Sequence, residues 1–338
     1  PADNTSRSLA RLRRLCLAAI IAAFVPGLLH AGQEITQTIE LKKGWNSVFL
    51  YAEPAEPDSD AVLAGTPVTQ VLTYYPKNSP VQFIQDPAEA AWEKSGWSRW
   101  VPPDRPEAVL KNLYAFQANQ PYIVYCTSDF TWNVTGTPRF RKRKWQPDSF
   151  NLVGFHVDPR VPPTFVQYFE GSRGHAGLHI YYLHNNKWIR VSAPSGVNVE
   201  FGQAYWMWCQ GGSDHQGPTE IKLPGTGDGL NFLAAVDELE IDVTNRSPNP
   251  LSFTLEAVSG NEVPLSRVIT SFTEEEITTY EPFSAYSTEK ASEPGEKIKV
   301  RLAVRRKEIL THEVTGLLRL CDDIGDCFYI PVRAERLK

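Results

Sequence analysis

One short segment occurs twice in this chain, as Gln120-Pro-Tyr122-Ile-Val-Tyr-Cys126 and as Gln203-Ala-Tyr205-Trp-Met-Trp-Cys209. The two versions align without a gap and share the glutamine, the tyrosine and the cysteine. Successive side chains of a β-strand point to opposite faces, and here both faces are apolar in both versions. The segment therefore predicts a central strand of a small sheet or barrel, present in two copies.

The sequence that precedes each segment is repeated as well. Asn46 lies in Leu-Lys-Lys-Gly-Trp-Asn and Asn151 in Ser-Phe-Asn, and each asparagine is followed eight residues later by a proline. An asparagine side chain can bond its own backbone where a strand leaves a turn, and a proline ends a strand because it cannot donate to the ladder. A tyrosine pair and then a tryptophan follow in both halves. We therefore predict two related β-modules, copy 1 over residues 32–140 and copy 2 over residues 141–224.

The Leu-x-x-Gly-Trp-Asn opening of copy 1, with its later Gln-x-Tyr strand, resembles the GWN-type β-modules that recur in exported and cell-surface bacterial proteins. The resemblance covers residues 35–224. Copy 1 keeps Gly44-Trp45-Asn46, whereas copy 2 has Ser149-Phe150-Asn151 at the same place. The resemblance implies an extracellular architectural or ligand-presenting role, and it brings no active site with it.

The composition favours β-structure along the whole chain. There are 26 prolines, one methionine and 11% aromatic residues; prolines interrupt helices, and aromatic side chains suit a pleated surface. After a glycine-rich linker that ends at residue 229, apolar and charged residues alternate in short runs separated by turn-forming clusters. This pattern predicts an immunoglobulin-like β-sandwich over residues 230–338. The predicted fold class is all-β, with two related small modules in tandem followed by this sandwich.

Residues 1–31 have the layout of a secretory signal peptide. A stretch with four arginines precedes an apolar run over residues 15–29, and Ala31 offers a small residue for cleavage. A membrane anchor is the alternative, but this run is shorter than the roughly 20 apolar residues that a spanning helix needs. The segment carries four arginines and one aspartate, so its removal takes the net charge from −5 to −8. Because an acidic protein suits nucleic-acid phosphates poorly, we expect no nucleic-acid partner. From the signal peptide we expect a secreted, periplasmic or cell-surface protein with no transmembrane segment after cleavage.

Four cysteines follow the predicted signal peptide, and export permits disulfides. Cys321 and Cys327 bracket a turn between two apolar runs, so we predict a disulfide across this hairpin, worth ~2–3 kcal/mol. Cys126 and Cys209 occupy equivalent positions in the two copies. They would pair only if their strands lay side by side, and the alternative is two small buried thiols.

The sequence lacks the motifs of the common enzyme classes. It contains no Gly-x-Ser-x-Gly elbow, no His-Glu-x-x-His, no phosphate-binding loop and no Cys-x-x-Cys. Four histidines are expected to be exposed loop residues rather than a zinc site: His156, His175, His179 and His184. The turn at residues 322–326 holds three aspartates, which could supply part of a calcium site but fit a solvated turn better. We therefore predict a non-enzymatic protein with no catalytic residue, no metal and no cofactor.

A basic run, Arg139-Phe-Arg-Lys-Arg-Lys144, falls at the junction of the two copies. It stands out because the chain as a whole is acidic, with a net charge of −5. A solvated linker is the simplest interpretation, and docking to an anionic surface or polymer is the alternative.

Aromatic side chains give the remaining indication of function. Nine tryptophans and 13 tyrosines exceed the needs of three small cores, and exposed rings serve protein contacts or stack against sugars. The candidate ligand-binding residues are Trp92, Trp97, Trp100, Trp188, Trp206 and Trp208. The leading hypothesis is an exported, non-enzymatic structural or interaction protein whose partner is a protein or a surface polysaccharide. The alternatives are a carbohydrate-binding protein that uses these rings and a hydrolase whose active site is assembled from loops of different modules.

Overall fold

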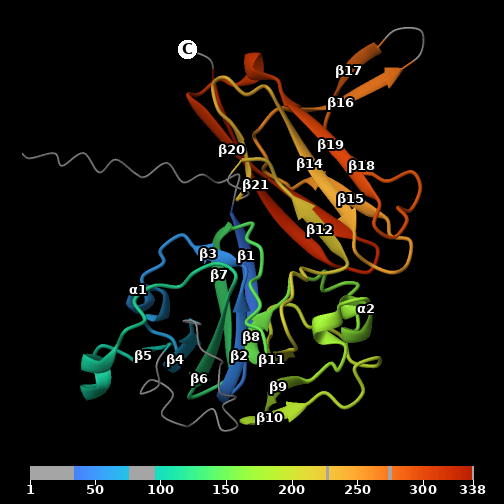
Figure 1. Cartoon of the computed structure of the whole chain (residues 1–338). Helices are drawn as coiled ribbons and strands as arrows, with labels where there is room; N and C mark the ends of the chain where they lie inside the picture. The colour runs from blue at the N-terminus through green and yellow to red at the C-terminus, as the bar shows by residue number, and fades with distance from the viewer. Residues whose placement is uncertain (1–33, 76–95, 226–227, 273–275, 337–338) are drawn as a thin grey trace, which may run out of the picture. The chain divides into compact units, whose positions relative to one another are not determined.

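The computed structural model describes residues 34–75, 96–225, 228–272 and 276–336 (Figure 1). These residues form mainly β-strands, with two short α-helices, α1 (Ser59–Leu63) and α2 (Phe165–Phe169). The all-β prediction is confirmed. Within these ranges, no helix has the length and apolar character needed to cross a membrane. The predicted signal peptide and Trp92 lie outside the described residues.

Each copy contains a four-stranded antiparallel sheet, and the order of the strands is the same in both. In copy 1 the order is β2-β6-β4-β5, formed by β2 (Gly44–Leu50), β6 (Gln120–Cys126), β4 (Val68–Tyr74) and β5 (Trp97–Trp100). In copy 2 the order is β8-β11-β9-β10, formed by β8 (Ser149–Gly154), β11 (Ala204–Cys209), β9 (Ile180–His184) and β10 (Lys187–Arg190). The repeated Gln-x-Tyr segment forms an inner strand of each sheet, as the sequence predicts. The two modules therefore share one sheet topology.

The local contacts of the module also recur in both copies. Asn46 accepts the Lys42 N–H at Oδ1 and donates from Nδ2 to the Lys42 carbonyl, both at 2.8 Å. Asn151 makes the same two bonds with Gln146, at 2.7 and 3.1 Å. The tyrosine hydroxyl of each repeated segment accepts a backbone N–H from five residues earlier, at 2.8 Å in copy 1 and 2.9 Å in copy 2. The predicted asparagine-stabilised turn is therefore present in both modules.

The two sheets pack face to face, and this packing explains why their inner strands are apolar on both faces. Tyr122 and Val124 of β6 point into the core of copy 1. Ile123, between them, belongs to a second core that all four strands of each sheet share, and Trp206 of β11 enters the same core from copy 2. Each inner strand is therefore covered once by its own module and once by the other copy.

Cys126 and Cys209 are free thiols, and both are fully buried. Each side chain points into the core of its own copy, away from the shared core. Because the two sheets present these residues on their far faces, the strands do not bring the sulfurs together. Burial raises the pKa of the Cys126 thiol to about 11.

Copy 1 has a second sheet, of order β1-β7-β3, formed by β1 (Ile35–Leu41), β7 (Phe130–Pro138) and β3 (Ala52–Pro54). In copy 2 the strand that follows β11 is β12 (Thr219–Lys222), and it pairs with β14 (Glu238–Asn245) of the third domain. The third domain therefore takes one strand from the sequence that we assigned to copy 2.

The third domain is the predicted β-sandwich. One sheet has the order β12-β14-β19-β16-β17 and the other the order β13-β21-β20-β15-β18. The strands not yet defined are β13 (Leu230–Phe232), β15 (Phe253–Ala257), β16 (Leu265–Phe272), β17 (Glu276–Pro282), β18 (Ala285–Ser287), β19 (Lys297–Val304), β20 (Glu313–Asp322) and β21 (Cys327–Glu335). The predicted disulfide joins Cys321 of β20 to Cys327 of β21. Short 3₁₀ helices lie in the connections, η3 (Pro106–Leu110), η4 (Arg173–His175) and η5 (Arg306–Glu308).

Candidate functional site

Four of the candidate ligand-binding tryptophans are core residues, each at most 8% exposed: Trp97, Trp100, Trp188 and Trp206. The Trp97 and Trp188 rings lie 6.1 and 6.3 Å from the Trp206 ring inside the shared core. Trp208 is half-buried, with its ring 5.2 Å from that of Phe150. A ring enclosed between packed sheets has no face open to a sugar, so the expected exposed stacking surface is not formed by these four residues.

The sequence led us to expect exposed loop histidines, and this expectation is not met by all of them. His179 and His184 are exposed, but His175 is buried because its loop folds over the core of copy 2, with the ring 4.1 Å from the Trp145 ring. These histidines do not converge on one point within the described residues. The one group of potential metal ligands in that part of the chain combines Asp158 with the two cysteines of the disulfide, whose sulfurs are already bonded to each other.

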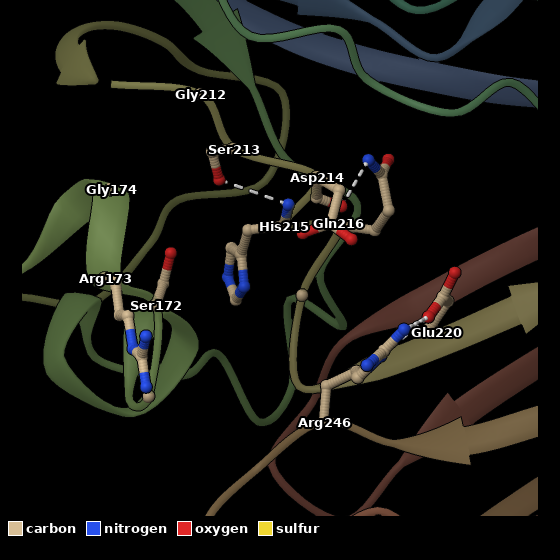
Figure 2. A pocket seen from close by; sticks show the side chains of 12 residues that line it. Ser172, Arg173, Gly174, Gly212, Ser213, Asp214, His215, Gln216, Glu220 and Arg246 are labelled. Atoms are coloured by element: carbon tan, nitrogen blue, oxygen red, sulfur yellow. Dashed lines mark hydrogen bonds and ion pairs between the residues drawn. The ribbon is translucent and has the colours of Figure 1, made fainter. Parts of the chain in front are cut away.

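A polar pocket of about 360 Å³ lies beside η4 in copy 2. Figure 2 shows Ser172 on one side of this pocket and Ser213 and His215 on the other. Arg246 Nε donates to Glu220 Oε2 at 2.6 Å where the pocket reaches the third domain. The pocket is therefore lined by hydroxyl, imidazole and charged groups, which are the groups that catalytic sites use.

Ser172, which lines the pocket, contacts the buried His175 behind the pocket wall, with 2.8 Å between Oγ and Nδ1. This contact is the one beside the pocket that most resembles a nucleophile and its base. Burial, and then the charges of His215 and Arg143, lower the pKa of His175 to about 3. A general base is most effective when its pKa lies near the working pH, so His175 activates Ser172 poorly. Its other ring nitrogen is buried without a hydrogen-bond partner in the described chain, whereas a catalytic triad orients that nitrogen with a carboxylate.

The aspartate turn between β20 and β21 is buried, in contrast to the solvated turn that we expected. Asp326 is fully buried and Asp322 is 7% exposed, while Asp323 is exposed. The reason is that the turn packs against copy 2, where the Gly325 carbonyl accepts the Asp158 N–H at 2.9 Å. Burial raises the pKa of Asp322 to about 6 and that of Asp326 well above its ordinary value.

The basic segment, residues 139–144, is anchored to the protein at Phe140 and Arg143, whereas its other four residues are exposed. Phe140 lies in the sandwich core, and Trp145, just after the segment, lies in the core of copy 2. Arg143 donates to the Gly154 carbonyl at 2.9 Å and lies over the Trp145 ring at 5.5 Å. The apolar residues inside and beside the basic run hold it in place and link the sandwich to copy 2.

A cavity of about 570 Å³ lies beside the basic segment, where both copies and the sandwich meet; we call it the junction cavity. Copy 1 contributes Tyr74 and Tyr75, copy 2 contributes Leu152 and His156, and the sandwich contributes Phe328. Sequence reasoning found the basic run but not these partners, because they are brought together only by the packing of three domains.

The sandwich carries a two-stranded arm formed by β16 and β17 (Figure 1). β19 pairs with β16 only over Leu265–Arg267, whereas β17 pairs with β16 as far as Phe272. Beyond Arg267 the arm therefore consists of two strands that pair with each other and with no other described strand. Residues 277–282 of β17 are all exposed, including Ile277 at 50% and Tyr280 at 56%.

The sequence matches no protein-family model, and the comparison with curated proteins finds no match. Solved structures give weak matches. A PapD-like domain of human CEP192 covers 36% of this chain and 86% of its own length, at 8% identity and a TM-score of 0.22. A FixG-related protein from Vibrio parahaemolyticus covers 35% of this chain and 96% of its own length, at 13% identity and a TM-score of 0.21. Escherichia coli alpha-2-macroglobulin matches 90% of this chain over 33% of its own length, at 10% identity and a TM-score of 0.22. Similarity at this level says nothing about function.

Proposed function

We propose that the chain is an exported, non-enzymatic interaction protein that binds a partner protein along the free edge of β17. The observation that carries this proposal is the arm itself, because its outer strand has an unpaired edge and two exposed faces. A two-stranded ribbon is marginally stable in water by itself, and an unpaired edge is a template on which an extended chain can add a strand.

The hydrogen bonds between β16 and β17 determine which backbone groups of β17 are available to a partner. The Phe283 N–H donates to the Leu265 carbonyl at 2.8 Å, and bonded and non-bonded pairs alternate in an antiparallel ladder. The N–H groups of Thr278 and Tyr280 therefore point outward, whereas Thr279 bonds to β16. Pro282 has no N–H to offer, so the usable edge is the part of β17 nearer the tip of the arm.

A groove of about 440 Å³ lies at the base of the arm and is lined by Tyr280, Pro282 and Glu238. The Tyr280 hydroxyl donates to Glu238 Oε1 at 2.6 Å, which fixes the ring beside the groove. An added strand would gain main-chain bonds from the edge of β17 and side-chain contacts from this groove. Protein partners suit the site because aromatic residues such as Tyr280 are enriched at protein interfaces.

Four further features support the rest of the proposal. The N-terminal sequence has the pattern of a signal peptide, and disulfides such as Cys321–Cys327 persist in oxidising compartments. Both support a secreted, periplasmic or cell-surface location, which also agrees with the resemblance to GWN-type modules. The low pKa of His175, about 3, makes it a poor general base for Ser172, which supports a non-enzymatic role.

The test uses two substitutions of one residue in the tagged full-length chain, expressed in its source cells. Thr278→Pro removes an outward N–H without removing a bond to β16, and Thr278→Val keeps that N–H and the shape of the side chain. After cross-linking and purification, we expect the protein partners recovered with the wild type to be lost with Thr278→Pro and retained with Thr278→Val. Equal recovery with both variants, at unchanged unfolding midpoints, would contradict the proposal.

A further inference from the structure

We infer that the junction cavity is a binding site for a short acidic oligosaccharide. The inference is independent of the β17 edge, since the cavity is formed by the two copies, the basic segment and Phe328, and contains no residue of the arm. A volume of about 570 Å³ lies in the ordinary range of small-ligand pockets.

The charge of the cavity favours an anion. Its walls include Arg141, Lys142, Arg143 and Lys144, and none of the described residues that line it is an aspartate or a glutamate. A cluster of four cations without a carboxylate is unusual in a chain of net charge −5. Several cations around a low-dielectric cavity raise the local concentration of an anionic ligand.

The four cations are not equally available to a ligand. Lys142 forms an ion pair with Glu220 at 3.0 Å, and Arg143 is held by backbone carbonyls and aromatic rings. Arg141 and Lys144 are exposed, and neither forms an ion pair with any described residue. These two side chains are therefore the ones that can close on a carboxylate or a sulfate of a ligand.

Two polar groups of the cavity have no partner within the described chain. His156 Nε2 and Asn119 Oδ1 are buried atoms without a hydrogen bond. Asn119 is held by its Nδ2, which donates to the Arg139 carbonyl at 2.6 Å, and by a left-handed backbone with φ of 58°. Buried polar atoms are costly when left unpaired, so a ligand with hydroxyl groups would satisfy both and gain affinity.

Aromatic and neutral groups beside the cations favour a sugar over other anions. Tyr75 lines the same cavity and is half-buried, whereas Tyr74 beside it belongs to the shared core. The His156 ring is set among aromatic neighbours, 5.4 Å from Phe49 and 6.1 Å from Phe328; burial, and then Arg143, lower its pKa to about 3, so the imidazole is neutral at physiological pH. Phosphate backbones of nucleic acids are instead bound along extended basic surfaces, whereas here the cations lie in one segment of six residues. A saccharide that carries both carboxylates and hydroxyls matches the cations, the rings and the unpaired polar atoms together.

Binding of defined oligosaccharides to the full chain tests the inference by isothermal titration calorimetry. The probes are tri-galacturonate, its fully methyl-esterified form, a heparin-derived tetrasaccharide and inorganic tripolyphosphate. We expect one saturable site for at least one of the two acidic oligosaccharides, and binding of the neutral ester weaker by about tenfold or more because a charge-assisted bond is lost.

Two variants of equal charge change assign the site. Arg141→Ala/Lys144→Ala should weaken binding of the acidic oligosaccharide by about 10- to 100-fold. Lys297→Ala/Lys299→Ala removes two exposed lysines of β19 and should leave the affinity unchanged.

Four results would overturn the inference, and they differ in what they indicate. Absence of saturable binding of both acidic oligosaccharides would remove the site, and equal affinity for the neutral ester would remove the role of charge. Equal affinity for tripolyphosphate would indicate a general anion site with no preference for sugars. Equal loss of binding in both double variants would indicate attraction by net charge only.

Discussion

Replacing Asp322 with asparagine is predicted to make the chain more stable at neutral pH. Asp322 Oδ1 accepts the N–H groups of Gly325 and Asp326 at 2.8 and 2.9 Å, and Oδ2 accepts the Thr219 hydroxyl at 2.7 Å. Burial nevertheless raises the pKa of Asp322 from 3.8 to about 6. Asp322→Asn keeps an acceptor for the backbone donors, and its amide can donate to the Thr219 oxygen, so the substitution removes the buried charge and preserves the turn.

The sign and size of the effect follow from linkage between protonation and folding. Because the folded pKa of this acid lies above its unfolded value, the folded state binds the proton more tightly, and stability falls as pH rises from about 4 to about 6. The rise from 3.8 to about 6 corresponds to about 3 kcal/mol lost above that range. The variant has no proton to lose there. We therefore expect the two proteins to be equally stable near pH ~4 and the variant to be more stable by about 3 kcal/mol near pH ~8.

Urea unfolding of the full chain, followed by far-UV circular dichroism across this pH range without reductant, measures the difference. Asp323→Asn is the matched control, since it lies in the same turn with an exposed side chain, and it should not reproduce the pH-dependent gain. A gain for Asp322→Asn that is the same at both ends of the pH range would refute the burial argument. So would a variant that is less stable at high pH, because the hydrogen bonds to the carboxylate would then outweigh its desolvation.

Two further predictions concern the duplicated scaffold. Asn151→Ala should cost about 2–3 kcal/mol and Asn46→Ala about 1 kcal/mol, because only the first leaves its partners unpaired in a buried turn; urea unfolding that gives equal losses would contradict this ranking. Gly154→Ala would place its Cβ 2.1 Å from Phe49 Cγ in the shared core and should destabilise the chain by about 1–3 kcal/mol. Gly196→Ala is its control, because the added Cβ meets only the Ala193 carbonyl at 3.8 Å. Equal urea-unfolding midpoints for the two alanine variants would show that the two copies can separate at Gly154 without loss of stability.

The architecture could be predicted from the sequence wherever the signal was local. The asparagine turns and the Gln-x-Tyr segment each report contacts within a few residues, and they lead to the same sheet in both copies. The transfer of β12 to the sandwich could not be predicted, because its partner β14 is set by long-range pairing and not by the residues of Thr219–Lys222. The disulfide could be predicted from the sequence because the two cysteines flank one hairpin turn.

The candidate site was harder to predict, because composition does not separate a core ring from an exposed ring. Trp206 was a candidate for ligand binding because the aromatic residues exceed the needs of three small cores, but the sheet that covers its ring belongs to the other copy. The same applies to Asp326, which sits in a turn by sequence but is buried by a neighbouring domain. In both residues, contact between modules overrides the local pattern.

This contact between modules also determines where a ligand can bind. The shared core uses equivalent faces of the two sheets, with Ile123 from one copy and Trp206 from the other, so the surface that each module would offer by itself is lost in the pair. A duplicated module therefore has two copies of its scaffold but only one junction, and the basic segment that fills this junction occurs once in the chain. On this argument the described part of the chain has one junction cavity, so the calorimetric stoichiometry for the acidic oligosaccharide should be one despite the internal repeat.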